Sequence, residues 1–289
     1  VQDQTLLPDS TVYVSLEPCA HHGKTPPCAE LLVKKKVKHV VIATLDPHEK
    51  VVGKGVQILK KAGIEVTIGV LENEACFLAR RFFTFHQKNR PYIVLKWAET
   101  VDGFLDMERT SIDQKPLRIS VEESNFYTHG LRASEHAIMV GTDTALLDNP
   151  TLTVRNAAGS DSIRIVLDQT LRLPQSLKMF SDGKPTIVLN KLKSTEEGCI
   201  RFVKPINWTL TSMLDKLKEL QIQSVLVEGG AKLLNSFISE NIWDEAHCIS
   251  SLEVIAQDGP LSPRVKAPIR KQFRSGSDSI SVYQNHARN

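Results

Sequence analysis

The sequence predicts two α/β domains, residues 1–88 and 91–289, joined by a short linker at Gln87–Pro91. The first observation is the length of 289 residues, because about 100–200 residues suffice for one domain. The second is that strand-like and helix-like segments alternate along both parts of the chain, with no repeat period. The third is a hydrophobic fraction of 41%, which is enough for more than one core.

In the first domain, strands and helices follow one another at short spacing. The predicted strands are Thr11–Leu16, which is rich in β-branched residues, the apolar run His39–Thr44, and the alternating segment Ile64–Val70. The predicted helices are Cys28–Lys36, Gly53–Gly63 and Cys76–His86. This order is typical of a parallel sheet within a three-layer α/β unit.

The second domain repeats the alternation over a longer stretch. Its predicted strands are Tyr92–Ala98, Ala137–Gly141, Ser162–Asp168, Thr186–Asn190 and Ser224–Glu228. Its predicted helices are Glu122–Ser134, Thr211–Leu220 and Ala231–Ile238. Asp148-Asn149-Pro150 is typical of an Asx-rich turn before a strand. The Pro- and charge-rich segment Ser250–Lys271 allows no assignment.

The composition excludes several classes of protein. A formal charge of +3 argues against a nucleic-acid binder, and the one basic cluster, Lys34–Lys36, fits the solvated face of a helix. The odd number of cysteines, five, favours a reducing cytosol over a disulfide scaffold. No apolar run is long enough for a membrane span, and no signal peptide opens the sequence, so we expect a cytoplasmic protein.

The most informative motif is the run LEPCAHHGKTPPC, which contains Cys19 and Cys28. A strand delivers the first thiol, and a loop stiffened by Pro and Gly returns the second at the start of a helix. Zinc binds Cys and His ligands, and it makes a coordinated water acidic enough to act as a nucleophile near neutral pH. From the spacing alone, two unliganded cysteines or a disulfide remain alternatives to a zinc site.

This run, together with Asp46-Pro47 and Gly53-Lys54-Gly55, resembles the deaminase half of the bifunctional riboflavin-biosynthesis deaminase/reductases. These enzymes belong to the cytidine-deaminase-like zinc hydrolases. The resemblance implies that Cys19 and Cys28 are zinc ligands. It also implies that His21 and Lys24 lie close to the substrate, with Lys24 facing its phosphate or its ring.

The family takes its third zinc ligand and its proton-transferring Glu from a His-x-Glu motif upstream of the first Cys. No histidine precedes Cys19 in this sequence. We therefore expect that an N-terminal segment carrying the motif is missing from the sequence, and we assign no catalytic acid or base. The alternatives are an inactive deaminase, or His21 or His22 acting as a substitute ligand.

Three segments of the second domain carry polar groups at strand ends. They are Tyr92–Gly103 with Lys96 inside a strand, Met139–Arg155, and Ser224–Lys232. In the last, Gly229-Gly230 joins a strand to a helix, where backbone N–H groups can approach a phosphate. Each signal is weak singly, because a buried strand with one lysine or an ordinary turn would also explain it.

Together, in this order, the three segments resemble the reductase half of the same enzymes, which has a dihydrofolate-reductase-like fold and uses NADPH. The resemblance implies that the cofactor contacts Ala98, Thr144, Asp148, Gln169, Gly230, Ala231, Lys232, Leu233, Leu234, Asn235 and Ser236. It implies that the substrate contacts Arg132, Leu152, Arg155 and Glu228. The two guanidinium groups suit a phosphate, and Glu228 suits a ribose hydroxyl. Lys96 is a candidate for proton delivery or for a structural role.

The resemblance therefore implies a zinc- and NADPH-dependent enzyme of riboflavin synthesis. It would deaminate a phosphoribosylated diaminopyrimidine and then reduce the ribosyl side chain to ribityl. The resemblance also implies a homodimer or a larger homo-oligomer, with no nucleic-acid or membrane partner. The alternatives are a single-function reductase with a vestigial deaminase domain, a nucleic-acid base deaminase with an added domain, and a non-enzymatic nucleotide-binding module.

Overall fold

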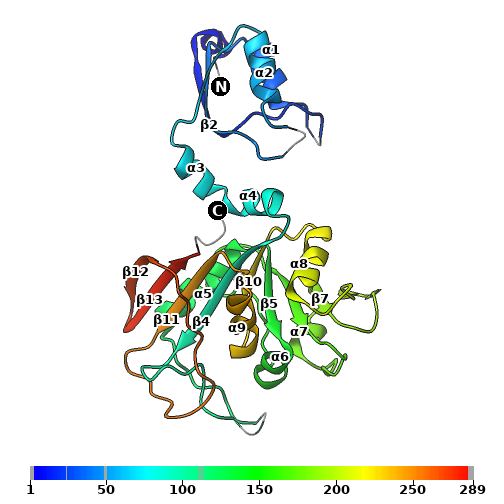
Figure 1. Cartoon of the computed structure of the whole chain (residues 1–289), viewed down its shortest axis with the longest axis vertical. Helices are drawn as coiled ribbons and strands as arrows, with labels where there is room; N and C mark the ends of the chain where they lie inside the picture. The colour runs from blue at the N-terminus through cyan, green and yellow to red at the C-terminus, as the bar shows by residue number, and fades with distance from the viewer. Residues whose placement is uncertain (1–2, 24, 49–50, 110, 112, 286–289) are drawn as a thin grey trace. The chain divides into compact units, whose positions relative to one another are not determined.

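The computed structural model describes residues 3–23, 25–48, 51–109, 111 and 113–285. The chain divides into two compact units, Val1–Asn89 and Arg90–Asn289, each with its own sheet (Figure 1). In the part of the chain so described, no helix has the length and apolar character needed to cross a bilayer.

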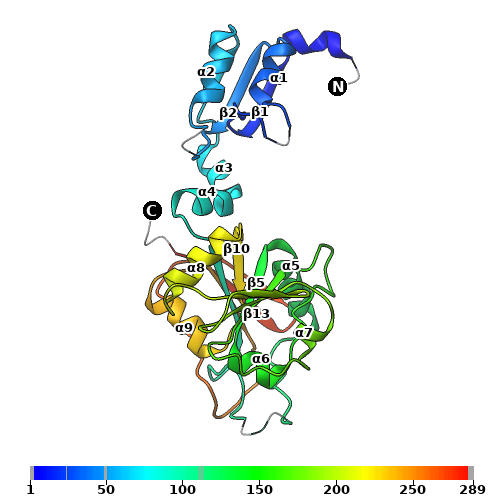
Figure 2. The same ribbon diagram turned by 90° about the vertical axis from the view of Figure 1, so that its right-hand side faces the viewer.

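Unit 1 (Val1–Asn89) contains a three-stranded parallel sheet in the order β1-β2-β3. Its elements are a 3-10 turn at Gln4–Asp9, β1 (Thr11–Leu16), α1 (Cys28–Lys34), β2 (His39–Thr44), α2 (Lys54–Lys61), β3 (Glu65–Ile68), α3 (Glu72–Leu78) and α4 (Arg80–Gln87). Helices α1 and α2 pack on one face of the sheet around Val40, Ile42 and Leu59 (Figure 2). The three-layer prediction requires a further layer on the opposite face of the sheet. Tyr13 of β1 lies on that face and is 75% exposed.

Unit 2 (Arg90–Asn289) contains a ten-stranded sheet in the order β12-β13-β11-β4-β10-β5-β6-β7-β9-β8. Its strands are β4 (Tyr92–Glu99), β5 (Ala137–Gly141), β6 (Ile163–Leu167), β7 (Thr186–Leu189), β8 (Thr195–Glu197), β9 (Ile200–Val203), β10 (Ser224–Val227), β11 (Glu245–Ser250), β12 (Ile269–Ser275) and β13 (Asp278–Gln284). The run from β11 to β9 is parallel, whereas β8, β12 and β13 pair antiparallel.

Helices cover both faces of this sheet, as Figure 2 shows. They are α5 (Glu122–Ser134), α6 (Thr142–Asp148), α7 (Lys178–Ser181), α8 (Leu210–Glu219) and α9 (Ala231–Ser239). Residues of α8 and α9 pack on one face with Leu95 and Val227. Residues of α5, α6 and α7 pack on the other face, with Val94 and Leu226. The two core clusters alternate along each strand, so neighbouring side chains serve opposite faces.

Two sequence-based expectations need correction, and the structure also describes the segment that the sequence left unassigned. The segment predicted as one helix over Cys76–His86 forms two helices, because the backbone leaves the helical conformation at Ala79. The stretch after Gly141 forms helix α6 rather than only a turn, and it ends at Asn149 in a left-handed conformation. The unassigned tail begins at the end of β11 and leads into the antiparallel hairpin β12–β13.

Gly55 marks a close approach within unit 1. A Cβ at this position would lie 2.0 Å from the Pro18 carbonyl oxygen. Glu17, next to Pro18 and only 3% exposed, accepts hydrogen bonds from the backbone N–H groups of Gly53 at 2.9 Å and Val56 at 3.2 Å. These contacts hold the start of α2 against the strand end that carries Cys19.

We predict that Gly55→Ala destabilises unit 1 by about 2 kcal/mol, because the backbone must shift to relieve the overlap. Hydrogen exchange of unit 1 amides would measure the change. Gly23→Ala is the matched control, since a Cβ there meets nothing within 4 Å. Equal protection in the two variants would contradict the prediction.

Candidate functional site

A compact ionic cluster lies at the carboxyl end of the central strands of unit 2. Glu228 follows β10 directly, Lys96 lies near the end of the adjacent β4, and Arg132 lies in the last turn of α5. Ligands commonly bind beyond the carboxyl ends of parallel strands, because connecting loops and helix N-termini meet there.

Arg132 and Glu228 form a bidentate ion pair. Nε and Nη2 of Arg132 donate to the two Glu228 carboxylate oxygens, both at 2.8 Å. Lys96 Nζ lies 3.8 Å from Glu228 Oε2. The three side chains are only 10–13% exposed, so water screens their charges weakly.

Burial and charge act in opposite directions on this cluster. Burial alone would favour neutral Glu228, but the charges of Arg132 and Lys96 outweigh it and hold the pKa of Glu228 at about 2. Burial lowers the pKa of Lys96, although Glu228 partly offsets this effect. The cluster therefore combines a permanent carboxylate with an amine that releases its proton more readily than an exposed lysine does.

The loop that follows α6 brings Leu152 and Arg155 to the same region. Leu152 is 3% exposed and has a φ of 56°, and the carbonyl of the next residue, Thr153, accepts from Arg132 Nη1 at 3.3 Å. The exposed Arg155 donates to Thr151 Oγ1 at 2.8 Å, and its backbone N–H donates to His129 Nδ1. Because Glu228 already occupies the Arg132 guanidinium, Arg155 is the better placed of the two to receive a phosphate.

The predicted cofactor residues lie on or next to several elements of unit 2, namely α9, α6, β4 and β6. Gly230 donates its backbone N–H to Thr144 Oγ1 at 3.0 Å, which ties α6 to the N-terminus of α9. Asp148 forms an ion pair of 2.5 Å with Arg109, a residue that the sequence did not suggest. Ala98 is half-buried on β4, and Gln169 is half-buried in the turn after β6.

The residues of α9 itself divide into two groups. Leu233 and Leu234 are buried in the core, so only their backbone could contact a cofactor. The solvent reaches the other positions at least in part, namely Ala231, Lys232, Asn235 and Ser236. The Lys232 Nζ atom lies 3.6 Å from Asp143 Oδ2. A Cβ on Gly230 would approach Thr144 Oγ1 to 3.3 Å, so this position favours a residue without a side chain.

In unit 1, the two predicted metal ligands lie together. The backbone N–H of Cys28 donates to Cys19 Sγ at 3.3 Å, and both thiols are free. The neighbouring Cys19 thiol, with burial, raises the pKa of Cys28. A divalent cation would reverse this effect by stabilising both thiolates, so the pair fits part of a zinc site.

The remaining predictions for the cysteine loop are only partly described. His21 is exposed, and Lys24 lies outside the described residues. Within the described ranges, no group of three or more His, Cys, Asp or Glu side chains could hold a metal ion. Glu17 precedes Cys19 but is not available as a proton carrier, since backbone N–H groups occupy its carboxylate.

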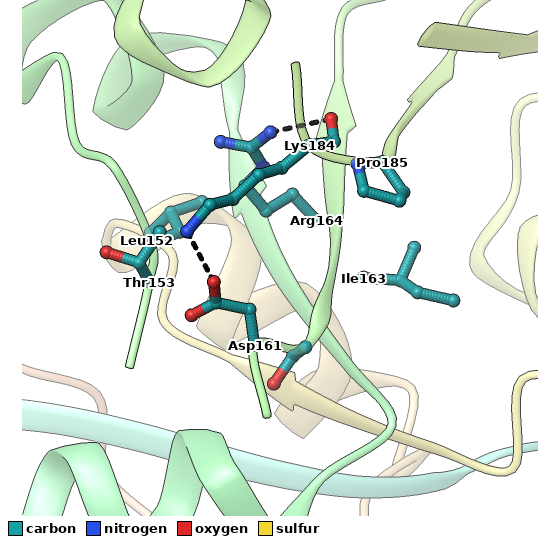
Figure 3. Close-up of a pocket in the computed structure, with 8 residues that line it drawn as sticks. Leu152, Thr153, Asp161, Ile163, Arg164, Lys184 and Pro185 are labelled. Atoms are coloured by element: carbon teal, nitrogen blue, oxygen red, sulfur yellow. Dashed lines mark hydrogen bonds and ion pairs between the residues drawn. The ribbon is translucent and has the colours of Figure 1, made fainter. Parts of the chain in front are cut away.

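A small cavity of about 200 Å³ lies behind the Leu152 loop (Figure 3). Its lining includes Leu152, Thr153 and the ion pair of Asp161 with Lys184, at 2.5 Å. Arg164, 2% exposed, forms a bidentate pair with Asp182, and its Nε has no partner in the described structure. Asp161 also accepts from the backbone N–H of Val154, so this region supports the loop that carries Arg155.

Known proteins resemble this chain in sequence and in fold. A family model described as the RibD C-terminal domain matches residues 91–251. The riboflavin biosynthesis protein RibD of Aquifex aeolicus is 42% identical over 244 residues, covering 81% of this chain and 67% of that protein. RibD of Actinobacillus pleuropneumoniae is 35% identical over 272 residues, covering 89% of this chain and 70% of that protein.

A solved structure extends the likeness to both units. It is the diaminohydroxyphosphoribosylaminopyrimidine deaminase/5-amino-6-(5-phosphoribosylamino)uracil reductase of Thermotoga maritima. It is 32% identical, with a TM-score of 0.84, and the match covers 95% of this chain and 79% of that chain. The mixed α/β fold with a dihydrofolate-reductase-like unit 2 is therefore confirmed.

We predict that the Glu228 carboxylate makes unfolding of unit 2 depend on acid pH. Its pKa is lowered on folding, so its stabilisation is complete above about pH 5 and is lost as the pH falls toward 2. Between pH 6 and pH 3 the wild type should lose about 2 kcal/mol more than Glu228→Gln. Urea unfolding followed by fluorescence of Trp97, Trp208 and Trp243 measures this difference, and equal losses would contradict the assignment.

Proposed function

Because the chain belongs to the RibD family of riboflavin-biosynthesis proteins, we propose that it acts in riboflavin synthesis as a zinc-dependent deaminase and an NADPH-dependent reductase. The observation that carries the reductase proposal is the buried Arg132–Glu228–Lys96 cluster beside the Gly230 helix start. The deaminase proposal rests on the adjacent thiols of Cys19 and Cys28.

The proposed reduction converts a ribosyl side chain to ribityl. NADPH, when bound, supplies a hydride to C1 of the sugar, and the ring oxygen takes a proton as the C1–O bond breaks. Arg155 binds the phosphate of the substrate, and Glu228 accepts a hydrogen bond from a sugar hydroxyl. Lys96, whose pKa is lowered by burial, would deliver the proton.

The cofactor would lie along the start of α9. The backbone of Gly230 and the accessible positions Lys232 and Ser236 would hold its phosphates, since the helix N-terminus favours negative charge. Thr144 and Asp148 would border the same site from α6. Of the predicted cofactor contacts, Leu233 and Leu234 would act only through their backbone.

The proposed deamination takes place in unit 1. Cys19 and Cys28 would hold zinc, which activates water for attack on the ring carbon that bears the amine. His21 and Lys24 would contact the pyrimidine or its phosphoribosyl group. A third ligand and a proton-transferring acid are needed in addition to these residues.

We predict that Arg155→Met raises the KM for 5-amino-6-(5-phosphoribosylamino)uracil at least tenfold, because a charged contact to phosphate is lost. The KM for NADPH should not change. Arg201→Met, which removes an exposed arginine on β9, is the matched control. Unchanged kinetics in Arg155→Met would contradict the substrate assignment, and a wild type that does not oxidise NADPH with this substrate would overturn the reductase proposal.

We further predict that Cys19→Ser in the full-length protein abolishes stoichiometric zinc, measured by elemental analysis after dialysis. Cys199→Ser, at an exposed cysteine of unit 2, should retain it. Zinc retained in both variants would remove the ligand assignment. A wild type that lacks zinc but reduces the substrate would favour a single-function reductase, and turnover of single-stranded DNA would favour a nucleic-acid deaminase.

A further inference from the structure

Lys96 lies between two polar side chains on the neighbouring strands. His247 on β11 pairs in register with Lys96, and Glu228 follows Val227, which pairs with Leu95. Leu95 and Trp97 belong to the core on the α8–α9 face, so Lys96 points to the opposite face, beneath α5. Glu228, Lys96 and His247 therefore form one row across three adjacent strands.

His247 belongs to a buried chain of hydrogen bonds. Its Nδ1 lies 2.6 Å from the Tyr127 hydroxyl, and its Nε2 lies 2.8 Å from Glu245 Oε1. The Tyr92 hydroxyl donates to the other oxygen of Glu245 at 3.0 Å. Because a carboxylate only accepts, Nε2 of His247 donates to Glu245, and the Tyr127 hydroxyl is the hydrogen-bond partner of Nδ1. Burial, followed by the charge of Glu245, raises the pKa of Tyr127, so its phenol stays protonated and can donate.

Helix α5 is thus attached to the sheet by polar contacts on both sides of β4. Arg132 contacts Glu228 on the β10 side, and Tyr127 contacts His247 on the β11 side. Lys96 lies on the strand between these two attachments. The first attachment includes a substrate-binding residue of the proposed site, whereas the second has no part in that mechanism.

We propose that Tyr127 and His247 are positioning residues, which hold α5 down over Lys96 and so keep its amine away from water. This inference rests on the proposed reductase function only for its consequence in catalysis. The physical claim concerns the amine itself: loss of the Tyr127 hydroxyl should admit water beside Lys96 and reduce the cost of charging it.

Other charged groups near Lys96 also affect its pKa. Glu228 stabilises its charged form, whereas Arg132 on α5 disfavours it, and Cys248 on β11 has a small effect in the same direction as Glu228. Burial lowers the pKa of His129 on α5, and the charges of Arg132, Arg155 and Lys96 act in the same direction. His247 is not among the charges that act on Lys96. A change at the Tyr127 hydroxyl therefore acts on Lys96 through water access and not through a lost charge.

The decisive variant is Tyr127→Phe. It keeps the ring that packs against Phe273, with centroids 5.5 Å apart, and removes only the hydroxyl that reaches His247. The titration of Lys96 can be followed by NMR of lysines labelled at Cε, with its resonance identified by its loss in Lys96→Met. Tyr13→Phe, at a tyrosine 75% exposed in unit 1, is the matched control.

We expect Tyr127→Phe to raise the pKa of Lys96 by about one unit, toward that of an exposed lysine, while Tyr13→Phe leaves it unchanged. The pH profile of kcat for the reductase should shift in the same direction, with the KM for NADPH unaffected. An unchanged Lys96 titration in Tyr127→Phe would overturn the inference. If the wild type shows no reductase activity, the proposed function fails, and the NMR titration still decides whether Tyr127 and His247 shield Lys96.

Discussion

The bidentate pairing of Arg132 with Glu228 is the interaction on which the rest of the candidate site depends. It joins the last turn of α5 to the end of β10, and through the Thr153 carbonyl it also fixes the loop that carries Arg155. A carboxylate buried to this degree is stable only because two cations surround it. Burial lowers the pKa of Lys96, and the Glu228 carboxylate partly offsets this effect.

The sequence predicted the strands and helices whose local residue pattern is typical of the element that they form. The strand Ala137–Gly141 and the helix Glu122–Ser134 have the predicted bounds. The strand is a continuous apolar run that is buried almost throughout, whereas the helix buries the polar Ser124, Thr128 and His129. The strand β11 was not predicted, since its sequence EAHCIS reads as polar. Its polar side chains are buried because they bind one another and residues distant in sequence, such as Tyr92 and Tyr127. The local sequence of β11 gives no indication of these distant hydrogen-bond partners.

The candidate site shows the same division. Lys96, Arg132, Arg155 and Glu228 could be singled out because they stand beside strand ends and resemble a family pattern. The sequence did not suggest that Arg109 pairs with Asp148, or that Glu228 already occupies the guanidinium of Arg132. These contacts join residues separated by 39 and 96 positions, and only the folded chain brings them together.

Glu17 connects the pair of thiols at Cys19 and Cys28 to helix α2. Its carboxylate receives the backbone N–H groups at the start of α2, while two residues later Cys19 receives the N–H that opens α1. One short segment therefore orients the first turns of both helices of unit 1. The segment that carries Cys19 also holds the start of α2 through Glu17. A cation bound by the two thiols would therefore stabilise α2 as well. Substitutions at the start of α2 would in turn change the metal affinity of the thiol pair, although these residues do not contact the ion.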